Sequence, residues 1–319
     1  MSRIDFPEAR VGIHSIDHFA LEVPDLDRAA HFLGAFGLRL ERQPQQLLLR
    51  AAGSDHVWGR VLQGGDRKRL AYISVRCHPE DWPTMINQIV GAGGSAADAH
   101  AAAPSGGYWF HDPHGLTVQL LAGDKLMVDH KAALPDLTVP ANVRGAPARS
   151  RAARAVPGRL SHLALFTPDA TASLAFHTAA LGVRLADRSG DIIAFTYGRH
   201  GSDHHLLAFL QGEGTGLHHS SWDVPSPDDV GLGNTQMRAA GYTHHWGPGR
   251  HVLGSNYFNY VRDDFGQWWE HSCHIDYIEK DAPWEMANFA DEDSLYLWGP
   301  DVPEAFTRND EPQTSTVAP

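Results

Sequence analysis

The sequence has little cysteine, no long apolar run and no excess of basic residues. Cys77 and Cys273 are its only cysteines in 319 residues, which argues against a disulfide framework and favours a reducing cytoplasm. No apolar run approaches the roughly 18 residues that a membrane span requires, and the first residues lack the apolar segment of a signal peptide. The formal net charge of −12 argues against nucleic acid as a partner, because such binding depends on basic patches.

What the chain does contain is typical of a globular protein with two domains. Hydrophobic residues make up 42% and charged residues 20%, which is ordinary for a soluble fold, and the length suffices for two domains. Histidine is abundant, with 21 residues. Only their positions can therefore identify the histidines that have a chemical role.

The first half predicts two successive β-α-β-β-β units. Residues 14–23 alternate like a half-buried strand that ends at Pro24, and Asp25 can cap a helix over Leu26–Phe36 that ends at Gly37. Strands are then expected near residues 38–41, 46–50 and 57–62. The second unit is expected to comprise a strand over Arg69–Cys77, a helix near 81–91 and strands within 107–121.

The same plan repeats in the second half. Asp17–Asp25 matches Ser161–Asp169, Leu70–Cys77 matches Leu217–Val224, and the turn at Asp112–Gly115 matches Asp263–Gly266. Such self-similarity predicts an α+β fold in which four β-α-β-β-β modules form two barrel-like domains. We expect a non-catalytic domain over 1–133, a Pro/Ala/Arg-rich linker over 134–158, a catalytic domain over 159–275 and a C-terminal tail over 276–319 that could act as a lid. From about Thr307 the tail is polar, and we expect it to be disordered.

Two histidines and one carboxylate of the second half form a candidate metal site. Strand alternation places His219 on the face of Ser221 and His218 on the face of Trp222, and the small serine favours His219 as the inward-facing residue. With His162 and Glu270, this completes the two-histidine, one-carboxylate set of non-haem iron(II) oxygenases. Taken alone, a single histidine on a strand is more often a core or surface residue than a metal ligand.

The first half provides an internal comparison for this set. The residues that match the three candidate ligands are His18, Tyr72 and Gln119. Because a tyrosine and a neutral amide are poor ligands for Fe(II), only the second half is expected to bind metal.

Residues 159–275 resemble the type I extradiol ring-cleavage dioxygenases of the vicinal oxygen chelate superfamily. The motifs that carry the resemblance are His162 in Leu-Ser-His-Leu-Ala-Leu-Phe, the Leu217-His-His219 run, and Gly247-Pro-Gly-Arg-His251 followed by Tyr260 and Glu270. The resemblance implies an enzyme that inserts both atoms of O2 into a catechol-type or trihydroxylated ring, next to the hydroxyls. It also implies His162, His219 and Glu270 as ligands of Fe(II), with Mn(II) as the second choice.

The resemblance further implies residues that contact the substrate. His205 matches the family's acid–base histidine, with His204 as the competing choice, and His251 and Tyr260 match its substrate-side hydrogen-bonding pair. The branch that accepts carboxylated substrates has an arginine where this chain has Trp246, so a neutral, single-ring substrate is expected. We also expect a homo-oligomer.

Two other functions are possible on this fold. A glyoxalase-like metal-dependent lyase or isomerase usually draws four ligands from paired modules and lacks the His251–Tyr260 spacing. A ligand-sequestering protein that resembles bleomycin-resistance proteins is normally half this length and needs no metal triad.

Overall fold

The computed structural model describes residues 9–135 and 138–312. Its first half contains two helices and eight strands, together with a short 3-10 helix η1 (Pro79–Asp81). The elements are β1 (Ser15–Val23), α1 (Leu26–Phe36), β2 (Arg39–Gln43), β3 (Gln46–Arg50), β4 (Gly59–Gln63), β5 (Arg69–Cys77), α2 (Trp82–Gly91), β6 (Ser95–Ala96), β7 (Tyr108–His111) and β8 (Thr117–Ala122).

The second half repeats this arrangement, with short additional elements before its first strand, within the repeat and near the C-terminus. Its modules comprise β9 (Arg159–Thr167), α3 (Ala170–Leu181), β10 (Arg184–Ser189), β11 (Ile193–Tyr197), β13 (Leu207–Gln211), β14 (Gly216–Asp223), α4 (Pro227–Ala239), β15 (His245–Arg250), β16 (Tyr257–Arg262) and β17 (Trp268–Cys273). The additional elements are η2 (Arg149–Arg151), β12 (Ser202–Asp203), β18 (Tyr277–Ile278), β19 (Asn288–Phe289), α5 (Asp291–Ser294) and η3 (Glu304–Thr307).

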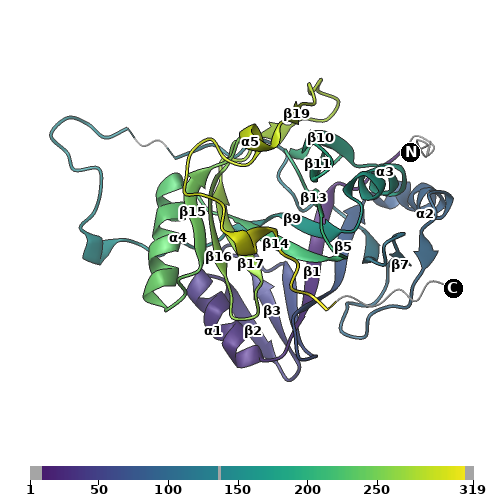
Figure 1. Ribbon diagram of the computed structural model, residues 1–319, viewed down its shortest axis with the longest axis horizontal. Helices are drawn as coiled ribbons and strands as arrows, with labels where there is room; N and C mark the ends of the chain where they lie inside the picture. The colour runs from purple at the N-terminus through teal and green to yellow at the C-terminus, as the bar shows by residue number, and fades with distance from the viewer. Residues whose placement is uncertain (1–8, 136–137, 313–319) are drawn as a thin grey trace.

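Each half forms one large mixed sheet (Figure 1). The strand orders are β2-β3-β4-β1-β5-β8-β7-β6 and β15-β16-β17-β14-β9-β13-β11-β10-β19. In both sheets the first strands of two modules pair antiparallel at the centre, β1 with β5 and β9 with β14. Each of these strands also pairs in parallel with the last strand of its own module. The predicted duplication of four β-α-β-β-β modules is confirmed.

Local sequence signals determine the ends of the first helix. The side chain of Asp25 accepts hydrogen bonds from the backbone N–H groups of Asp27 and Arg28, which otherwise have no partner in the first turn. Gly37 ends the helix with a φ of 106°, a left-handed conformation that glycine adopts without steric cost.

The two halves share one hydrophobic core. Phe19 of β1 packs against Trp222 of β14 and Trp269 of β17, with ring centroids 6.5 and 6.0 Å apart. Buried residues of all four long helices join the same cluster. The opposite faces of the sheets belong to separate, smaller clusters. The two sheets therefore pack against each other through one face each. The opposite face of the second sheet remains available for a functional site.

The segment that links the two sheets is largely exposed, whereas the C-terminal residues pack on the second sheet. Residues 138–150 are exposed and extend away from both sheets (Figure 1), whereas Ala155 is buried and donates its N–H to Gln236 of α4. The C-terminal residues run back over the second sheet, where β19 pairs with β10. None of the described helices is long and apolar enough to cross a membrane.

Candidate metal centre

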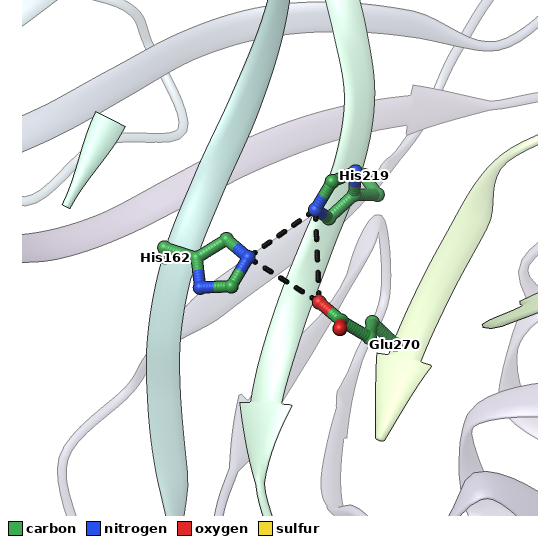
Figure 2. Close-up of side chains that lie close together, drawn as sticks. All are labelled: His162, His219 and Glu270. Atoms are coloured by element: carbon green, nitrogen blue, oxygen red, sulfur yellow. Dashed lines mark hydrogen bonds and ion pairs between the residues drawn. The ribbon is translucent and has the colours of Figure 1, made fainter. Parts of the chain in front are cut away.

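Three neighbouring strands bring His162, His219 and Glu270 together (Figure 2). His162 lies on β9, His219 on β14 and Glu270 on β17, and all three are buried. The Nε2 atom of His162 is 3.3 Å from both Nε2 of His219 and Oε2 of Glu270. Nε2 of His219 is 3.7 Å from the same carboxylate oxygen. In the described part of the chain, this is the one group of three such side chains whose ligand atoms converge closely enough for a metal ion.

A bulge in β14 places both adjacent histidines on the inner face of the sheet. The pairing of β14 with β9 shifts register between Leu217 and His219, so the residue added at this point interrupts the alternation of side chains. His218 and His219 both line the same cavity, whereas Leu217 and Trp222 belong to the shared core. The expectation that His218 shares the face of Trp222 is wrong for this reason.

The Nδ1 atoms of the two histidines lie 2.6 Å apart, but their Nε2 atoms have different partners. His218 Nε2 donates to the backbone oxygen of Phe306, 2.7 Å away, while His219 Nε2 is directed at His162 and Glu270 (Figure 2). His219, the residue predicted to be the ligand, therefore has its Nε2 atom where the three side chains converge.

The donor set fits a divalent cation. Ligand atoms bound at right angles about 2.1 Å from one ion lie about 3 Å apart, close to the separations observed here. Oε1 of Glu270 accepts a hydrogen bond from Asn256 Nδ2, but its buried Oε2 has no hydrogen-bond partner of good geometry among the described residues. A buried carboxylate oxygen without a partner is costly unless a cation binds it.

Protonation states also favour metal binding. Burial lowers the pKa of His219 well below its ordinary value, and the neighbouring histidines lower it further. Burial would raise the pKa of Glu270, but the imidazole of His162, 3.3 Å from Oε2, and the charge of His251 lower it overall. A neutral imidazole and an ionised carboxylate are the forms that bind metal.

At the equivalent position in the first half, the matching side chains are occupied by hydrogen bonds. His18 Nε2 lies 3.0 Å from the hydroxyl of Tyr72, and Gln119 accepts from Ser74 and donates to the backbone oxygen of Gly106. The strand registers correspond, since Ser74 pairs with His18 and Gln119 as Ser221 pairs with His162 and Glu270.

A cavity of about 230 Å³ opens beside the candidate ligands His162 and His219. Its walls come from strands β9, β10, β11, β13, β14, β15 and β16 and from the C-terminal segment, so the second sheet curls around it. The apolar lining residues are Ile192, Ile193, Phe195, Leu210, Trp246, Leu253, Leu295 and Phe306. The other eleven lining residues have polar side chains, and such a combination of apolar walls and polar groups is typical of a small-molecule site.

The structure separates the two candidates for the acid–base histidine. His205 lines the cavity, and its ring centroid is 4.0 Å from that of His162. His204 is fully buried behind it and pairs with Asp187, with 2.7 Å between Nε2 and Oδ2. Burial lowers the pKa of His205 well below its ordinary value, and the surrounding histidines lower it further.

His251 and Tyr260 form a hydrogen-bonded pair on the cavity wall. His251 Nδ1 donates to the backbone oxygen of Leu295 at 2.5 Å, so in the neutral ring Nε2 accepts from the Tyr260 hydroxyl, 2.9 Å away. Nε2 of His251 also lies 3.8 Å from Oε1 of Glu270. Burial and the charge of Glu270 raise the pKa of Tyr260 well above its ordinary value, which keeps the hydroxyl protonated.

Sequence reasoning missed several residues of this site. Asn256 holds Glu270, and Leu295 and Phe306 close the cavity from the C-terminal segment. Apolar residues within this polar segment, such as Leu295 and Phe306, were the available signal.

The expected disorder from Thr307 is wrong for residues 307–312. Asp310 pairs with Arg262, and buried Glu311 accepts from the backbone N–H of Leu217, at 2.8 Å. A polar side chain can thus fix a segment when its partners are buried backbone groups. Residues 313–319 lie outside the described part of the chain.

Comparison with known proteins identifies relatives of the whole chain. Residues 159–271 match the family model described as the Glyoxalase/Bleomycin resistance protein/Dioxygenase superfamily. Metapyrocatechase 2 from Cupriavidus necator is 48% identical over 302 residues, which cover 95% of this chain and 94% of the relative.

Two solved structures share the fold over nearly the whole length. The Mn(II)-bound glyoxalase from Novosphingobium aromaticivorans has a TM-score of 0.73 at 25% identity and covers 92% of this chain and 94% of its own. An extradiol ring-cleaving dioxygenase from B. fuscum has a TM-score of 0.75 at 19% identity, with 96% and 85% covered.

Proposed function

Because the chain belongs to the extradiol ring-cleavage dioxygenases of the vicinal oxygen chelate superfamily, we propose that His162, His219 and Glu270 bind its catalytic metal ion. Its activity is the insertion of both atoms of O2 into a catechol-type ring, with cleavage of the bond next to the hydroxyls. The observation that carries the ligand assignment is the convergence of two Nε2 atoms and one carboxylate oxygen within 3.3–3.7 Å.

We propose Fe(II) as the metal. Two neutral histidines and one carboxylate are the usual protein ligands of a non-haem iron(II) oxygenase. Bound there, the ion would supply Lewis acidity toward the phenolic oxygens and electron transfer to dioxygen. The single carboxylate would leave a positive site that favours a catechol anion.

The residues around the triad have roles in this proposal. His205 takes the proton of the second catechol hydroxyl and later returns it to an oxygen of the reacting substrate, as general acid–base catalysis requires. His251 and Tyr260 exchange part of their mutual hydrogen bond for one to a substrate oxygen. Trp246, Phe306 and Leu295 surround the ring and exclude water.

The preferred substrate in this proposal is an uncharged, single-ring catechol or trihydroxybenzene. None of the described residues that line the cavity is lysine or arginine, so a ring-bound carboxylate would enter without a bidentate partner. Trp246 stacks on Tyr260, with 5.2 Å between ring centroids. The guanidinium of Arg250 lies over Tyr257, 5.1 Å from its ring centroid, and Nε donates to Ser255.

The ligand assignment is tested by alanine variants. His162→Ala, His219→Ala and Glu270→Ala should each reduce bound iron from about one ion per chain to near zero and abolish catechol-dependent oxygen uptake. His218→Ala should retain iron, because Nε2 of His218 donates to the backbone oxygen of Phe306 and its Nδ1 contacts only the far side of the His219 ring. Gln119→Ala, the matched control for Glu270→Ala in the first half, should leave metal content unchanged.

The same series distinguishes the competing assignments. Loss of iron from His218→Ala together with full iron in His219→Ala would show that His218 is the ligand. Metal-free protein reloaded with Fe(II) should regain more oxygen uptake than protein reloaded with Mn(II). Equal or better recovery with Mn(II) would overturn the iron assignment.

The organisation of the molecule is also proposed. We propose that residues 1–133 form a non-catalytic domain, 134–158 a linker, 159–275 the catalytic domain and 276–319 a tail that covers the site. Exposed Met286, Leu297 and Trp298 on this tail support a homo-oligomer, which light scattering would test. The two free, buried cysteines support a cytoplasmic location.

A further inference from the structure

A hydrogen-bonded row of side chains leads from the cavity to the C-terminal segment. His205 lines the cavity, and its Nδ1 lies 3.0 Å from Nδ1 of His204. Nε2 of His204 lies 2.7 Å from Oδ2 of Asp187, and Oδ1 of Asp187 accepts the backbone N–H of Ala287, also at 2.7 Å. All three side chains of the row are buried.

The directions of these hydrogen bonds follow from the end of the row. An ionised carboxylate only accepts, so Nε2 of His204 carries the proton, and Nδ1 of the same neutral ring is then an acceptor. Nδ1 of His205 must therefore donate to it. This leaves Nε2 of His205 without a proton, which is the state a general base needs before it receives one from a substrate hydroxyl.

We propose that Asp187 and His204 are positioning residues that hold His205 in the tautomer able to accept the substrate proton. The proposal rests on the proposed role of His205. Neither residue lines the cavity, so each acts through His205 alone. Phe195 and Trp284 contact the ring of His204, with centroids 6.0 and 5.6 Å away, and hold it in the row.

The backbone N–H of Ala287 makes Asp187→Asn a sharp test. In this variant the amide oxygen should keep the hydrogen bond from Ala287, because the amide nitrogen cannot accept it. The amide NH2 group then faces His204 Nε2 and forces that atom to accept. The two hydrogen bonds that join Asp187, His204 and His205 reverse, and Nε2 of His205 becomes protonated before substrate arrives.

The measurements are kcat, KM and metal content of the iron-loaded enzyme. Asp187→Asn should lower kcat by roughly 10²–10⁴, the usual contribution of an acid–base group, with KM and iron content little changed. Asp187→Ala should lower kcat less, because it removes the preference of His205 for one tautomer without reversing that preference. His204→Phe, which also ends the row, should resemble Asp187→Ala. Asp191→Asn is the matched control and should behave like the parent, since its carboxylate is 89% exposed at the turn after β10.

The order of the variants separates tautomer control from a structural role. If Asp187 only supported the fold, asparagine, its closest isostere, would be tolerated better than alanine. A lower kcat in Asp187→Ala than in Asp187→Asn would therefore overturn the proposal. A parental kcat in both Asp187→Asn and His204→Phe would also overturn it.

A second readout follows the proton on a bound ligand. The absorption band of 4-nitrocatechol shifts to longer wavelength as each hydroxyl ionises. Without oxygen, the parent should bind it with both hydroxyls ionised, whereas Asp187→Asn should leave one proton in place. Identical spectra would overturn the proposal. Parental turnover in His205→Ala would instead overturn the proposed role of His205, whereas an inactive His205→Ala beside a fully active Asp187→Asn would overturn only the positioning role.

Discussion

At the scale of single residues, the proposed substrate preference depends on the side chain of Trp246 in the cavity wall. Trp246 is buried against Tyr260 and Phe306, and its indole N–H donates to the backbone oxygen of Pro300. An aromatic side chain there offers apolar surface to a ring but no charge to a carboxylate. The side chain that would compensate, Arg250, is held over Tyr257.

A panel of catechols tests this interpretation. Oxygen-uptake rates for catechol, methylcatechols, trihydroxytoluene, dihydroxybiphenyl and homoprotocatechuate should give higher kcat/KM for the neutral single rings. A preference for homoprotocatechuate would contradict substrate neutrality and indicate that Arg250 turns toward the cavity. A preference for the biphenyl would contradict only the single-ring assignment.

At the scale of structural elements, one buried carboxylate joins the C-terminal segment to both halves of the molecule. Oε1 of Glu311 accepts from Leu217 N–H and lies 3.3 Å from Lys68 Nζ, and Oε2 accepts from Leu70 N–H at 2.8 Å. Leu217 directly precedes the adjacent histidines of β14. Glu311 thus joins the segment that bears Phe306 to both halves of the molecule.

Glu311→Ala should therefore weaken both stability and substrate binding. Removing one partner of a buried ion pair costs about 3–5 kcal/mol, and two backbone N–H groups lose their acceptor. A loosened segment should also raise KM as Phe306 leaves the cavity wall. Urea unfolding and steady-state kinetics measure these effects, and Glu292→Ala, on an exposed position of the same segment, is the control. Unchanged stability in Glu311→Ala would show that the segment is held by its other contacts.

At the scale of the whole molecule, the junction of the two halves contains a cluster of three histidines. His14 is fully buried, its Nε2 bonds to the backbone oxygen of Gly123, and His78 and His200 lie beside its ring, with Asp81 3.7 Å from His200. Burial, reinforced by the charge of His78, lowers the pKa of His14 to about 4.

This lowered pKa predicts a loss of stability in acid. Between pH 6.5 and about 4 the unfolded chain binds a proton at His14 that the folded chain does not, so the free energy of unfolding falls as pH falls through this window. His14→Gln should reduce that slope by up to about 1.4 kcal/mol per pH unit. Urea unfolding of both proteins at equal metal loading measures the difference, with exposed His130→Gln as the control. Parallel pH profiles for His14→Gln and the parent would contradict the prediction.

The sequence by itself determined the modules and the candidate ligands. Strand alternation, the cap at Asp25 and the αL glycine at Gly37 are local signals, and the duplication exposed the mismatch of Tyr72 and Gln119 with His219 and Glu270. These features depend on residues close in the chain or on comparison of its two halves, so they can be read without coordinates.

Only the tertiary structure decided which side chains meet. The bulge that turns both His218 and His219 inward depends on the pairing of β14 with β9, and strict alternation could not show it. Asn256 reaches Glu270, Asp187 reaches His204, and Glu311 reaches Leu217 across 14, 17 and 94 positions. Such contacts are set by the curvature of one sheet and by the course of a segment with no periodic pattern, and neither is encoded locally.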